Sequence, residues 1–288
     1  MTFKDPTTST SGTRTLDCAG RKLVLDRTRI MGVLNLTPDS FSDGGKWLGK
    51  AAAVQHARAM QEAGADIIDV GGESTRPGAQ AVSLQQELDR VIPVIEIIVP
   101  QLHVPVSIDT SKPEVMREAV AAGAGMINDV YALRNQGALQ AAADLDVPVC
   151  LMHMLGDPRV MQNKPEYDDV AQQVKDFLLE RAGRCKKAGI SPEKIVLDPG
   201  FGFGKTLQQN ITLFHALPGL IASGYPLLVG VSRKSMIGQL TGRVVEDRVA
   251  GSITAATLAA RMGAAIIRVH DVAETRDALN VATALWPA

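Results

Sequence analysis

The sequence is poor in aromatic residues, in cysteine and in long apolar runs, and it carries almost no net charge. Aromatic residues make up 4% of the 288 residues, and the three cysteines, Cys18, Cys150 and Cys185, are far apart and form no Cys-x-x-Cys pair. A disulfide framework or a structural zinc site is therefore not expected, and we interpret the thiols as structural. The formal net charge of −1 disfavours a protein whose main function is to bind nucleic acid or an anionic membrane.

Targeting and membrane signals are also missing. No apolar stretch is long enough to span a bilayer, and the first residues, MTFKDPTTSTSGTRT, lack the apolar core of a secretory signal. We therefore expect a cytoplasmic protein with no membrane or nucleic-acid partner. Residues 1–13 are polar and rich in Ser and Thr, which predicts a disordered tail, and residues 14–288 are expected to form one domain.

One structural unit recurs along the rest of the chain. After LDCAGRKLVLD, which predicts a short hairpin at residues 16–26, short apolar runs alternate with polar loops and helical stretches rich in Ala, Glu and Leu. The predicted strands are RIMGVLNL, ADIIDVG, VPVSIDT, GMINDV, VPVCLMH, KIVLDPG, PLLVGVS and AAIIRVH. Glycines at positions 64, 123, 189 and 263 fall where four of the predicted helices should end.

Eight strand–helix units of this kind favour a (β/α)₈ barrel, the TIM barrel, in the α/β class. Nearly continuous apolar strands are typical of a parallel sheet covered by helices, and the length of the repeating region suits a barrel. A doubly wound open sheet is the alternative, because the same alternation builds it. The first predicted strand–helix turn contains no G-x-G-x-x-G, which counts against the alternative.

Polar residues stand at the carboxyl end of every predicted strand. In strand order they are Asn35, the GGESTRPG segment, Asp109, Asn128 with Asp129, His153, Asp198, the SRKS segment, and Arg268 with His270. Asp109 and Asp198 could each cap a helix or turn, Asn128 could be a satisfied buried amide, and His153 is more often structural than catalytic. Because the carboxyl ends of barrel strands surround the active site, their coincidence predicts a site.

The residue types suggest a ligand with two different sides. Asp109, Asn128 and Asp198 supply acceptors and one amide donor, which suit a flat heterocycle such as a pterin or guanine. Lys234, Arg268, His270 and the amide of Asn35 suit a phosphate or pyrophosphate. Arg268 and His270 are two positions apart and so share one face of a strand, which predicts an anion clamp. There is no HExxH, Walker or Ser-His-Asp signature.

These motifs resemble, in order, those of the dihydropteroate synthase family. The resemblance covers the chain from about residue 15 to its end and is carried by GVLNLTPDSFSDGG, GGESTRPG, SIDTSK, INDV, LMHM, LDPGFGFGK, GVSRKS and RVHDV. It implies condensation of a dihydropterin methyl pyrophosphate with 4-aminobenzoate to give 7,8-dihydropteroate and pyrophosphate, with Mg²⁺. It also implies a homodimer.

The resemblance further implies a role for each matching residue. The pterin diphosphate would be held by Thr75, Asp109, Asn128, Asp198, Lys234, Arg268 and His270. The 4-aminobenzoate pocket would contain Phe41, Ser42, Pro77, Phe203, Lys234 and Ser235. Asn35 would bind the metal, and Asp43, Arg76, Lys234, Arg268 and His270 would act in catalysis.

The polar loops after the first two strands would then form a lid. The implied reaction is dissociative: pyrophosphate leaves before the arylamine attacks, so the cationic intermediate must be kept from water. The TPDSFSDGG loop offers a Gly-Gly pivot, Phe41 and Asp43, and the STRPG loop offers Arg76. Three other interpretations remain. The first is a pterin-binding methyltransferase-type barrel, and the second is a non-catalytic paralogue that binds a pterin-like ligand. A barrel with merely capping polar residues is the third.

Overall fold

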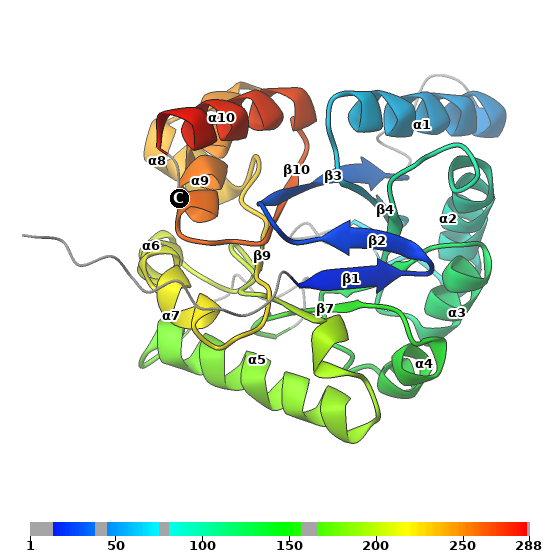
Figure 1. Ribbon diagram of the computed structural model, residues 1–288, viewed down its shortest axis with the longest axis horizontal. Helices are drawn as coiled ribbons and strands as arrows, with labels where there is room; N and C mark the ends of the chain where they lie inside the picture. Colours follow the sequence, from blue (N-terminus) through cyan, green and yellow to red (C-terminus); the bar gives the residue numbers. More distant parts are fainter. Residues whose placement is uncertain (1–13, 38–44, 75–80, 157–165, 287–288) are drawn as a thin grey trace, which may run out of the picture.

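Eight parallel strands form a ring at the centre of the structure (Figure 1). The computed structural model describes residues 14–37, 45–74, 81–156 and 166–286. The ring strands are β3 (Arg29–Asn35), β4 (Ile67–Gly71), β5 (Val106–Asp109), β6 (Met126–Asp129), β7 (Val149–Met152), β8 (Ile195–Asp198), β9 (Leu228–Val229) and β10 (Ile266–Val269).

The order of the strands identifies the sheet as a barrel. Strands β3 to β8 are neighbours in sequence order, β3 also pairs with β10, and β10 pairs with β9. A parallel bridge between Leu197 and Leu227 joins the two remaining edges. A doubly wound sheet reverses its strand order at one point, and this ring does not. The predicted (β/α)₈ class is confirmed.

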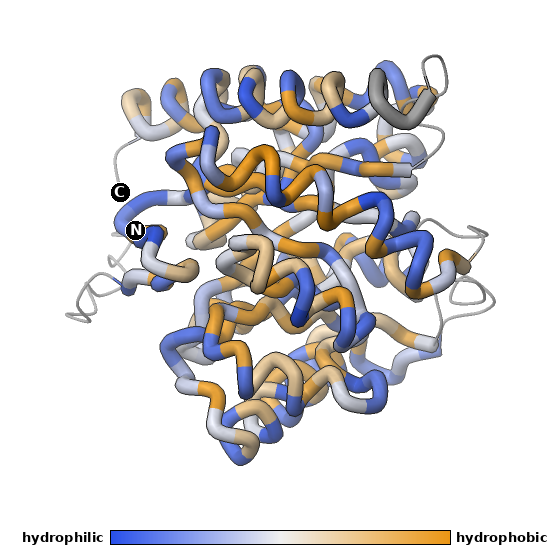
Figure 2. The backbone as a smooth tube through the Cα atoms, turned by 90° about the vertical axis from the view of Figure 1, so that its right-hand side faces the viewer, coloured by the Kyte–Doolittle hydropathy of each residue, from blue (hydrophilic) through white to orange (hydrophobic). Residues whose placement is uncertain are grey.

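Helices cover the outside of the ring and carry both hydrophilic and hydrophobic residues along their length (Figure 2). They are α1 (Gly45–Glu62), α2 (Leu84–Ile98), α3 (Pro113–Ala121), α4 (Ala138–Leu145), α5 (Val170–Lys187), α6 (Leu207–His215), α7 (Leu217–Ile221), α8 (Ser235–Thr241), α9 (Val249–Arg261) and α10 (Val272–Leu285), with 3₁₀ turns at Pro192–Lys194 and Val245–Asp247. The four predicted helix-ending glycines all have positive φ, between 98° and 104°. Among the described residues, no helix is both long and apolar enough to cross a membrane.

The predicted hairpin closes one end of the barrel. It consists of β1 (Thr15–Cys18) and β2 (Arg21–Val24), which pair in antiparallel fashion and lie across the ring in Figure 1. Leu16, Cys18 and Leu23 pack on a layer of inward-facing strand side chains: Met31, Ile67, Met126, Cys150, Val196, Leu228 and Ile266. This apolar floor seals the amino-terminal end, so ligands can enter only from the other end. The predicted tail, residues 1–13, lies outside the described residues, and the division into a tail and one domain stays a prediction.

The two faces of the ring are chemically different. Residues that alternate with the apolar floor layer, such as Ile30, Ile108 and Leu151, pack outward against the helices in the main core. The inward face is apolar at the hairpin end and polar at the carboxyl ends of the strands. All three cysteines are free and buried, which agrees with the structural role expected of them.

Candidate active site

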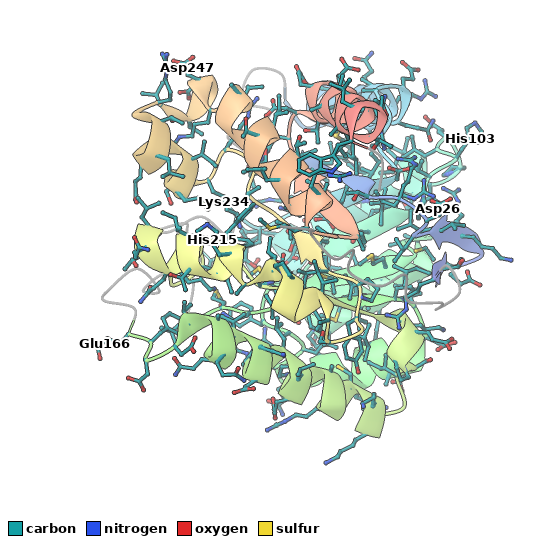
Figure 3. All side chains as sticks on the ribbon, turned by 60° about the vertical axis from the view of Figure 1, so that its left-hand side comes forward. Asp26, His103, Glu166, His215, Lys234 and Asp247 are labelled. Atoms are coloured by element: carbon teal, nitrogen blue, oxygen red, sulfur yellow. The ribbon has the colours of Figure 1, made fainter. Side chains whose placement is uncertain are left out.

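The strand register places the predicted polar residues inside the barrel. Gly71 pairs with Asp109, Asp109 pairs with Asn128, and Asn128 pairs with Cys150 of the apolar floor. Paired residues of a parallel sheet point to the same face, so Asp109 and Asn128 face the interior. Asp198 follows Val196 by two positions, and Arg268 follows Ile266 by two. The four side chains therefore converge above the floor. Figure 3 labels Asp26 at the hairpin end and Glu166 at the opposite end.

A network of charged and polar side chains connects four strands, β4, β5, β6 and β10. The Arg268 guanidinium donates from Nε to Asp69 Oδ2 at 2.7 Å and from Nη2 to Asp109 Oδ2 at 2.8 Å. The Asn128 side-chain amide donates to the same Asp69 oxygen at 3.1 Å. Asp69 and Asn128 are buried, and the Arg268 side chain is 23% exposed. The base of the site is thus a fixed array of one cation, two carboxylates and one amide.

Burial shifts the pKa values of the acids in this array. Desolvation raises the pKa of Asp109 to about 7, although the Arg268 charge opposes the rise. Desolvation also raises the pKa of Asp198, against the opposing charge of Lys234. For Arg268, burial lowers the pKa, but Asp69 and Asp109 outweigh it and the net direction is upward. Arg268 therefore stays charged, and Asp109 can exchange a proton near neutral pH.

Asp198 and its neighbour Gly200 build a tight turn after β8. Asp198 Oδ1 accepts from the Gly200 backbone N–H at 2.7 Å, so the carboxylate both faces the barrel and supports the turn. A Cβ on Gly200 would lie 1.9 Å from the His153 carbonyl oxygen, and its φ of 67° suits glycine. Both interpretations of Asp198, turn support and site residue, are compatible with this geometry.

Lys234 reaches the site from the start of α8. Its Nζ donates to the Phe201 carbonyl oxygen and lies 4.6 Å from the centre of the Phe203 ring. Burial lowers the pKa of Lys234 to about 8, although the Asp198 charge opposes this effect. A Cβ at Gly230 would stand 3.9 Å from Lys234 Nζ and 3.8 Å from Arg268 Cβ, so this glycine lies close to both cations. Ser235 is the first residue of α8.

His270 and Arg268 have different partners. The Nδ1 atom of His270 lies 3.0 Å from Ser232 Oγ, which also accepts from the His270 backbone N–H at 3.2 Å. Arg268 instead contacts Asp69 and Asp109. The two side chains stand at the end of β10 as expected, Arg268 within the strand and His270 directly after it, and their use as one anion clamp stays a prediction.

Asn35 ends β3 on the rim of the same array. It pairs with Gly71, which in turn pairs with Asp109. A Cβ on Gly71 would lie 3.8 Å from both Asn35 Oδ1 and Asp109 Oδ2, so the bare glycine lies between the two side chains. Among the described residues, no three His, Cys, Asp or Glu side chains are grouped to hold a metal ion. The amide oxygen of Asn35 is nevertheless a hard ligand of the kind that Mg²⁺ accepts.

Two strand-end residues have structural tasks. Asp129 lies next to Asn128 and so faces outward, where its two oxygens accept from the backbone N–H groups of Tyr131 and Leu133 at 2.8 Å. His153 is buried, and its Nδ1 lies 3.0 Å from the Lys205 ammonium group. Asp129 is therefore a turn cap, and His153 belongs to the support of the loop after β8.

Several of the predicted site residues lie outside the described residues. They are Phe41, Ser42, Asp43, Thr75, Arg76 and Pro77. Their predicted roles stay predictions.

Sequence reasoning missed two functional candidates, Asp69 and Lys205. Asp69 is fully buried in β4 and joins Arg268 to Asn128. A charged residue inside the apolar run IIDVG was the available signal, because buried acids are rare unless paired. Lys205 ends the GFGFGK motif and is 3% exposed. Its Nζ donates to the carbonyl oxygens of Gly200 at 2.8 Å and Phe203 at 3.1 Å.

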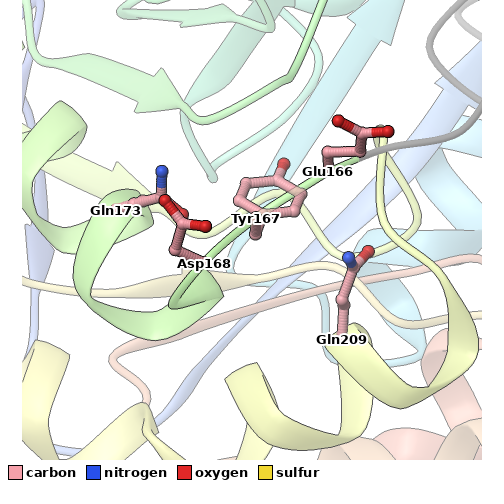
Figure 4. A pocket seen from close by; sticks show the side chains of 5 residues that line it. All are labelled: Glu166, Tyr167, Asp168, Gln173 and Gln209. Carbon is pink, nitrogen blue, oxygen red and sulfur yellow. The ribbon is translucent and has the colours of Figure 1, made fainter.

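A separate hollow lies on the rim of the barrel mouth. It has a volume of about 450 Å³ and is lined by Glu166, Tyr167, Asp168, Gln173 and Gln209, as Figure 4 shows. The Tyr167 hydroxyl donates to the Gly204 carbonyl oxygen at 3.0 Å. The hollow contains none of the strand-end residues, and we do not assign the substrate to it.

The fold and the site define a class of protein. A closed parallel barrel, sealed at its amino-terminal end and lined with ionisable groups at its carboxyl end, is the architecture of a (β/α)₈-barrel enzyme. The family model described as pterin binding enzyme matches residues 31–270.

Named relatives make the assignment more specific. The dihydropteroate synthase of Escherichia coli (strain K12) is 54% identical over 269 residues, which are 93% of this chain and 95% of the relative. That of Haemophilus influenzae is 49% identical, covering 90% and 94%. The chain belongs to the dihydropteroate synthase family of pterin-binding enzymes.

Solved structures agree with this result. A structure of Xanthomonas albilineans dihydropteroate synthase with 4-aminobenzoic acid is 57% identical and covers 96% of this chain and 99% of that chain, with a TM-score of 0.91. A second structure from that organism, in complex with 7,8-dihydropteroate, has a TM-score of 0.87 at 54% identity, covering 95% and 99%. A Yersinia pestis dihydropteroate synthase in a sulfonamide drug complex has a TM-score of 0.91 at 51% identity, covering 95% and 100%.

Proposed function

We propose that this chain is a transferase that joins the pterin methyl group of (7,8-dihydropterin-6-yl)methyl diphosphate to the amine of 4-aminobenzoate. The products are 7,8-dihydropteroate and diphosphate. The observation that carries the proposal is the convergence of Asp109, Asn128, Asp198, Lys234 and Arg268 above a sealed floor, in a chain with close dihydropteroate synthase relatives.

The pterin ring fits the acceptor side of this array. Carboxylates at Asp109 and Asp198 accept hydrogen bonds from ring N–H and amino groups. One N–H of the Asn128 amide is used by Asp69, which leaves a second N–H and the carbonyl oxygen for the ligand. Lys234 supplies a donor for ring acceptors. Thr75 is proposed to line the same pocket.

The diphosphate would lie on the cationic side, near Arg268 and His270. Asn35 is proposed to hold Mg²⁺, which fits the amide oxygen that this residue offers at the rim. When bound, the ion would neutralise charge on the leaving diphosphate. The protein side chains hold the leaving group in place and keep it close to the pterin methylene carbon.

The reaction breaks the carbon–oxygen bond to diphosphate and forms a carbon–nitrogen bond to the arylamine, which then loses a proton. We propose a dissociative order, because the electron-rich dihydropterin stabilises positive charge on the methylene carbon. Buried carboxylates at Asp109 and Asp198 favour that developing charge. The sealed floor of the barrel excludes water from one side.

The aminobenzoate is proposed to bind against Phe203, with its carboxylate near Lys234 and Ser235. Phe41, Ser42 and Pro77 complete this proposed pocket. A sulfonamide should therefore compete with 4-aminobenzoate and not with the pterin. Steady-state inhibition patterns test this, and noncompetitive inhibition against 4-aminobenzoate would contradict the pocket.

Asp43 and Arg76 are proposed to act when the loops that carry them close over the bound substrates. Replacing Asp43 with alanine should leave equilibrium binding of the pterin diphosphate nearly unchanged and lower the turnover number. Titration calorimetry and steady-state rates measure the two effects. Turnover close to that of the unchanged protein would contradict the lid, and lost pterin binding would place Asp43 in the ground-state site.

We further propose a homodimer and a cytoplasmic location. Among the described residues, most of the large exposed apolar side chains lie on or directly beside α8, α9, α10 and the 3₁₀ turn between α8 and α9: Leu240, Val244, Val245, Leu258, Val281, Leu285 and Trp286. A second copy packed on this surface would remove it from water. Light scattering of Leu258→Glu should show a weakened dimer, whereas an unchanged mass would contradict this interface.

A diphosphate-release assay tests the proposed activity. With both substrates and Mg²⁺ the chain should release diphosphate and form dihydropteroate, and omission of 4-aminobenzoate should stop product formation. Pterin binding without turnover would indicate a non-catalytic pterin-binding protein. Methyl transfer from methyltetrahydrofolate to a corrinoid would indicate the methyltransferase alternative.

A further inference from the structure

We infer that Asp69 is a positioning residue, which sets the pterin-binding array by holding Arg268 and Asn128 through one shared oxygen. This inference rests on the proposed pterin binding and concerns a residue that does not itself contact the ligand. Asp69 lies in the middle of β4, two residues before Gly71 at the strand end.

Burial shows that Asp69 cannot touch the substrate directly. The residue is 0% exposed, so its carboxylate acts only through the groups that it contacts. Those groups are Arg268 Nε at 2.7 Å and Asn128 Nδ2 at 3.1 Å, and both donate to Oδ2. One buried atom therefore links β4 to β6 and to β10, three strands of the barrel.

The Asp69 contacts decide which way each partner faces. Arg268 is held between two carboxylates, because its Nη2 also donates to Asp109 at 2.8 Å. Without Asp69, the guanidinium could pair with Asp109 alone and swing toward it. The Asn128 side-chain amide could likewise rotate, which would exchange the positions of the N–H donor and the carbonyl acceptor that it presents to the pterin.

The unused oxygen supports a role beyond simple packing. Asp69 Oδ1 and Ser107 Oγ are both buried, and neither has a hydrogen-bond partner within the described residues. They belong to residues paired in the β4–β5 register, so both face the barrel interior. A buried carboxylate with one unpaired oxygen lowers the stability of the fold. The presence of Asp69 is therefore better explained by its contacts with Arg268 and Asn128 in the site than by a contribution to stability.

The charge of Asp69 also acts on Asp109. The charged groups around Asp109 are Arg268 on β10, Asp69 on β4, Asp129 on β6, Glu87 on α2 and Lys234 at the start of α8. Asp69 raises the pKa of Asp109, which Arg268 opposes. If a neutral residue replaces Asp69, the repulsion between the Asp69 and Asp109 carboxylates is removed, and the Arg268 guanidinium can pair with Asp109 alone. Both changes lower the pKa of Asp109.

The test measures binding of 6-hydroxymethylpterin by titration calorimetry between pH 5.5 and 8.5. In the unchanged protein, affinity should fall as the pH drops through about 7, because protonated Asp109 loses an acceptor. In Asp69→Asn, affinity at pH 8 should fall about tenfold and the acidic midpoint should move down by roughly one pH unit.

Ser107→Ala is the matched control. It removes a buried polar group at the position on β5 that pairs with Asp69 and leaves the hydrogen bonds of Arg268 and Asn128 to Asp69 in place. Its affinity should change less than about twofold, with the same midpoint. A lower melting temperature for Asp69→Asn, without a shift of the midpoint, would overturn the inference in favour of a purely structural role.

A double substitution covers the case in which Asp69→Asn fails to fold. Arg268→Met combined with Asp69→Asn removes one buried charge of each sign, so neither partner of this ion pair is left charged without the other. Asp109 loses its Arg268 contact equally in Arg268→Met alone and in the double variant. Because Asp69 acts through Arg268 as well as through Asn128, adding Asp69→Asn to Arg268→Met should lower affinity by clearly less than the tenfold loss expected when Arg268 is present. A further tenfold loss would overturn the inference. If the unchanged protein does not bind the pterin, the proposed function itself is wrong.

Discussion

Asp109 illustrates at the scale of one residue how a buried carboxylate serves a binding site. Its oxygen accepts from Arg268, and its pKa is raised to about 7 by burial. Asp109→Asn keeps the shape of the side chain but replaces one acceptor with a donor. An unsatisfied buried group costs about 1–3 kcal/mol, so pterin affinity should fall at least about tenfold while the melting temperature changes little. Titration calorimetry and thermal unfolding measure the two quantities, and unchanged pterin binding would remove Asp109 from the site.

His153 gives a prediction about pH and stability. Burial is the main reason that its pKa is lowered to about 2, and the nearby Lys205 charge lowers it further. The folded protein therefore keeps His153 neutral, whereas the unfolded chain binds a proton near pH 6.5. The stabilisation that comes from keeping His153 neutral should be complete above pH 6.5. Below pH 6.5 the free energy of unfolding should decrease by up to about 1.4 kcal/mol per pH unit.

Thermal unfolding at pH 7.5 and 5.5 checks this expectation against His153→Gln. The variant lacks the titrating ring, so its melting temperature should fall less between the two pH values than that of the unchanged protein. Equal decreases in both proteins would contradict the assignment of this pH dependence to His153.

At the scale of elements, the loop after β8 depends on one buried lysine. Lys205 Nζ donates to the carbonyl oxygens of Gly200 and Phe203, and the same loop presents the Phe201 carbonyl that contacts Lys234. Lys205→Met would leave these acceptors without their donor, at a cost of about 1–3 kcal/mol for each buried group. We expect a lower melting temperature and about a tenfold lower kcat/KM for 4-aminobenzoate.

An exposed lysine provides the control for this substitution. Lys187 ends α5 and is exposed, so Lys187→Met should change neither stability nor kinetics by a measurable amount. If Lys205→Met retained normal kinetics at a temperature where it is folded, the loop would not need its lysine to shape the pocket.

Much of the element-level structure could be predicted from the sequence, and the reason is periodicity. The eight apolar runs, the AGRK turn of the hairpin and the helix-ending glycines are local signals, and all of them appear in the structure. Asp69 escaped prediction because its importance depends on Arg268, which is 199 residues away in the chain. Lys205 escaped prediction because it binds backbone carbonyl oxygens of its own loop, at Gly200 and Phe203, and no residue type marks such acceptors in a sequence. The sequence prediction groups Asp129 with the other strand-end residues because it directly follows Asn128. The sequence alone does not show which of two neighbouring strand residues faces the barrel interior.

At the scale of the whole molecule, stability and function occupy opposite ends of the barrel. The hairpin end is an apolar layer that includes Leu16, whereas the carboxyl end holds the charged array. Leu16→Ala should lower the free energy of unfolding by about 2–5 kcal/mol, because it opens a cavity in a sealed layer. The KM values for both substrates should stay within about twofold, since this residue is remote from the site.

Denaturant unfolding and steady-state kinetics of Leu16→Ala measure this separation. Leu84→Ala, which truncates an exposed leucine at the start of α2, is the control and should leave the free energy of unfolding nearly unchanged. Large changes in KM for Leu16→Ala would show that the two ends of the barrel are coupled.

The central claim is that the strand-end array inside the barrel, and no other surface, holds the pterin. A crystal structure of the chain with 6-hydroxymethylpterin tests it most directly. We expect the ring above the apolar floor, with its N–H groups donating to Asp109 and Asp198, its edge against the Asn128 amide and Lys234 beside it. A pterin bound in the rim hollow at Tyr167, or one in the barrel that makes no hydrogen bond to Asp109, Asn128 or Asp198, would show that the strand-end array is not the pterin site.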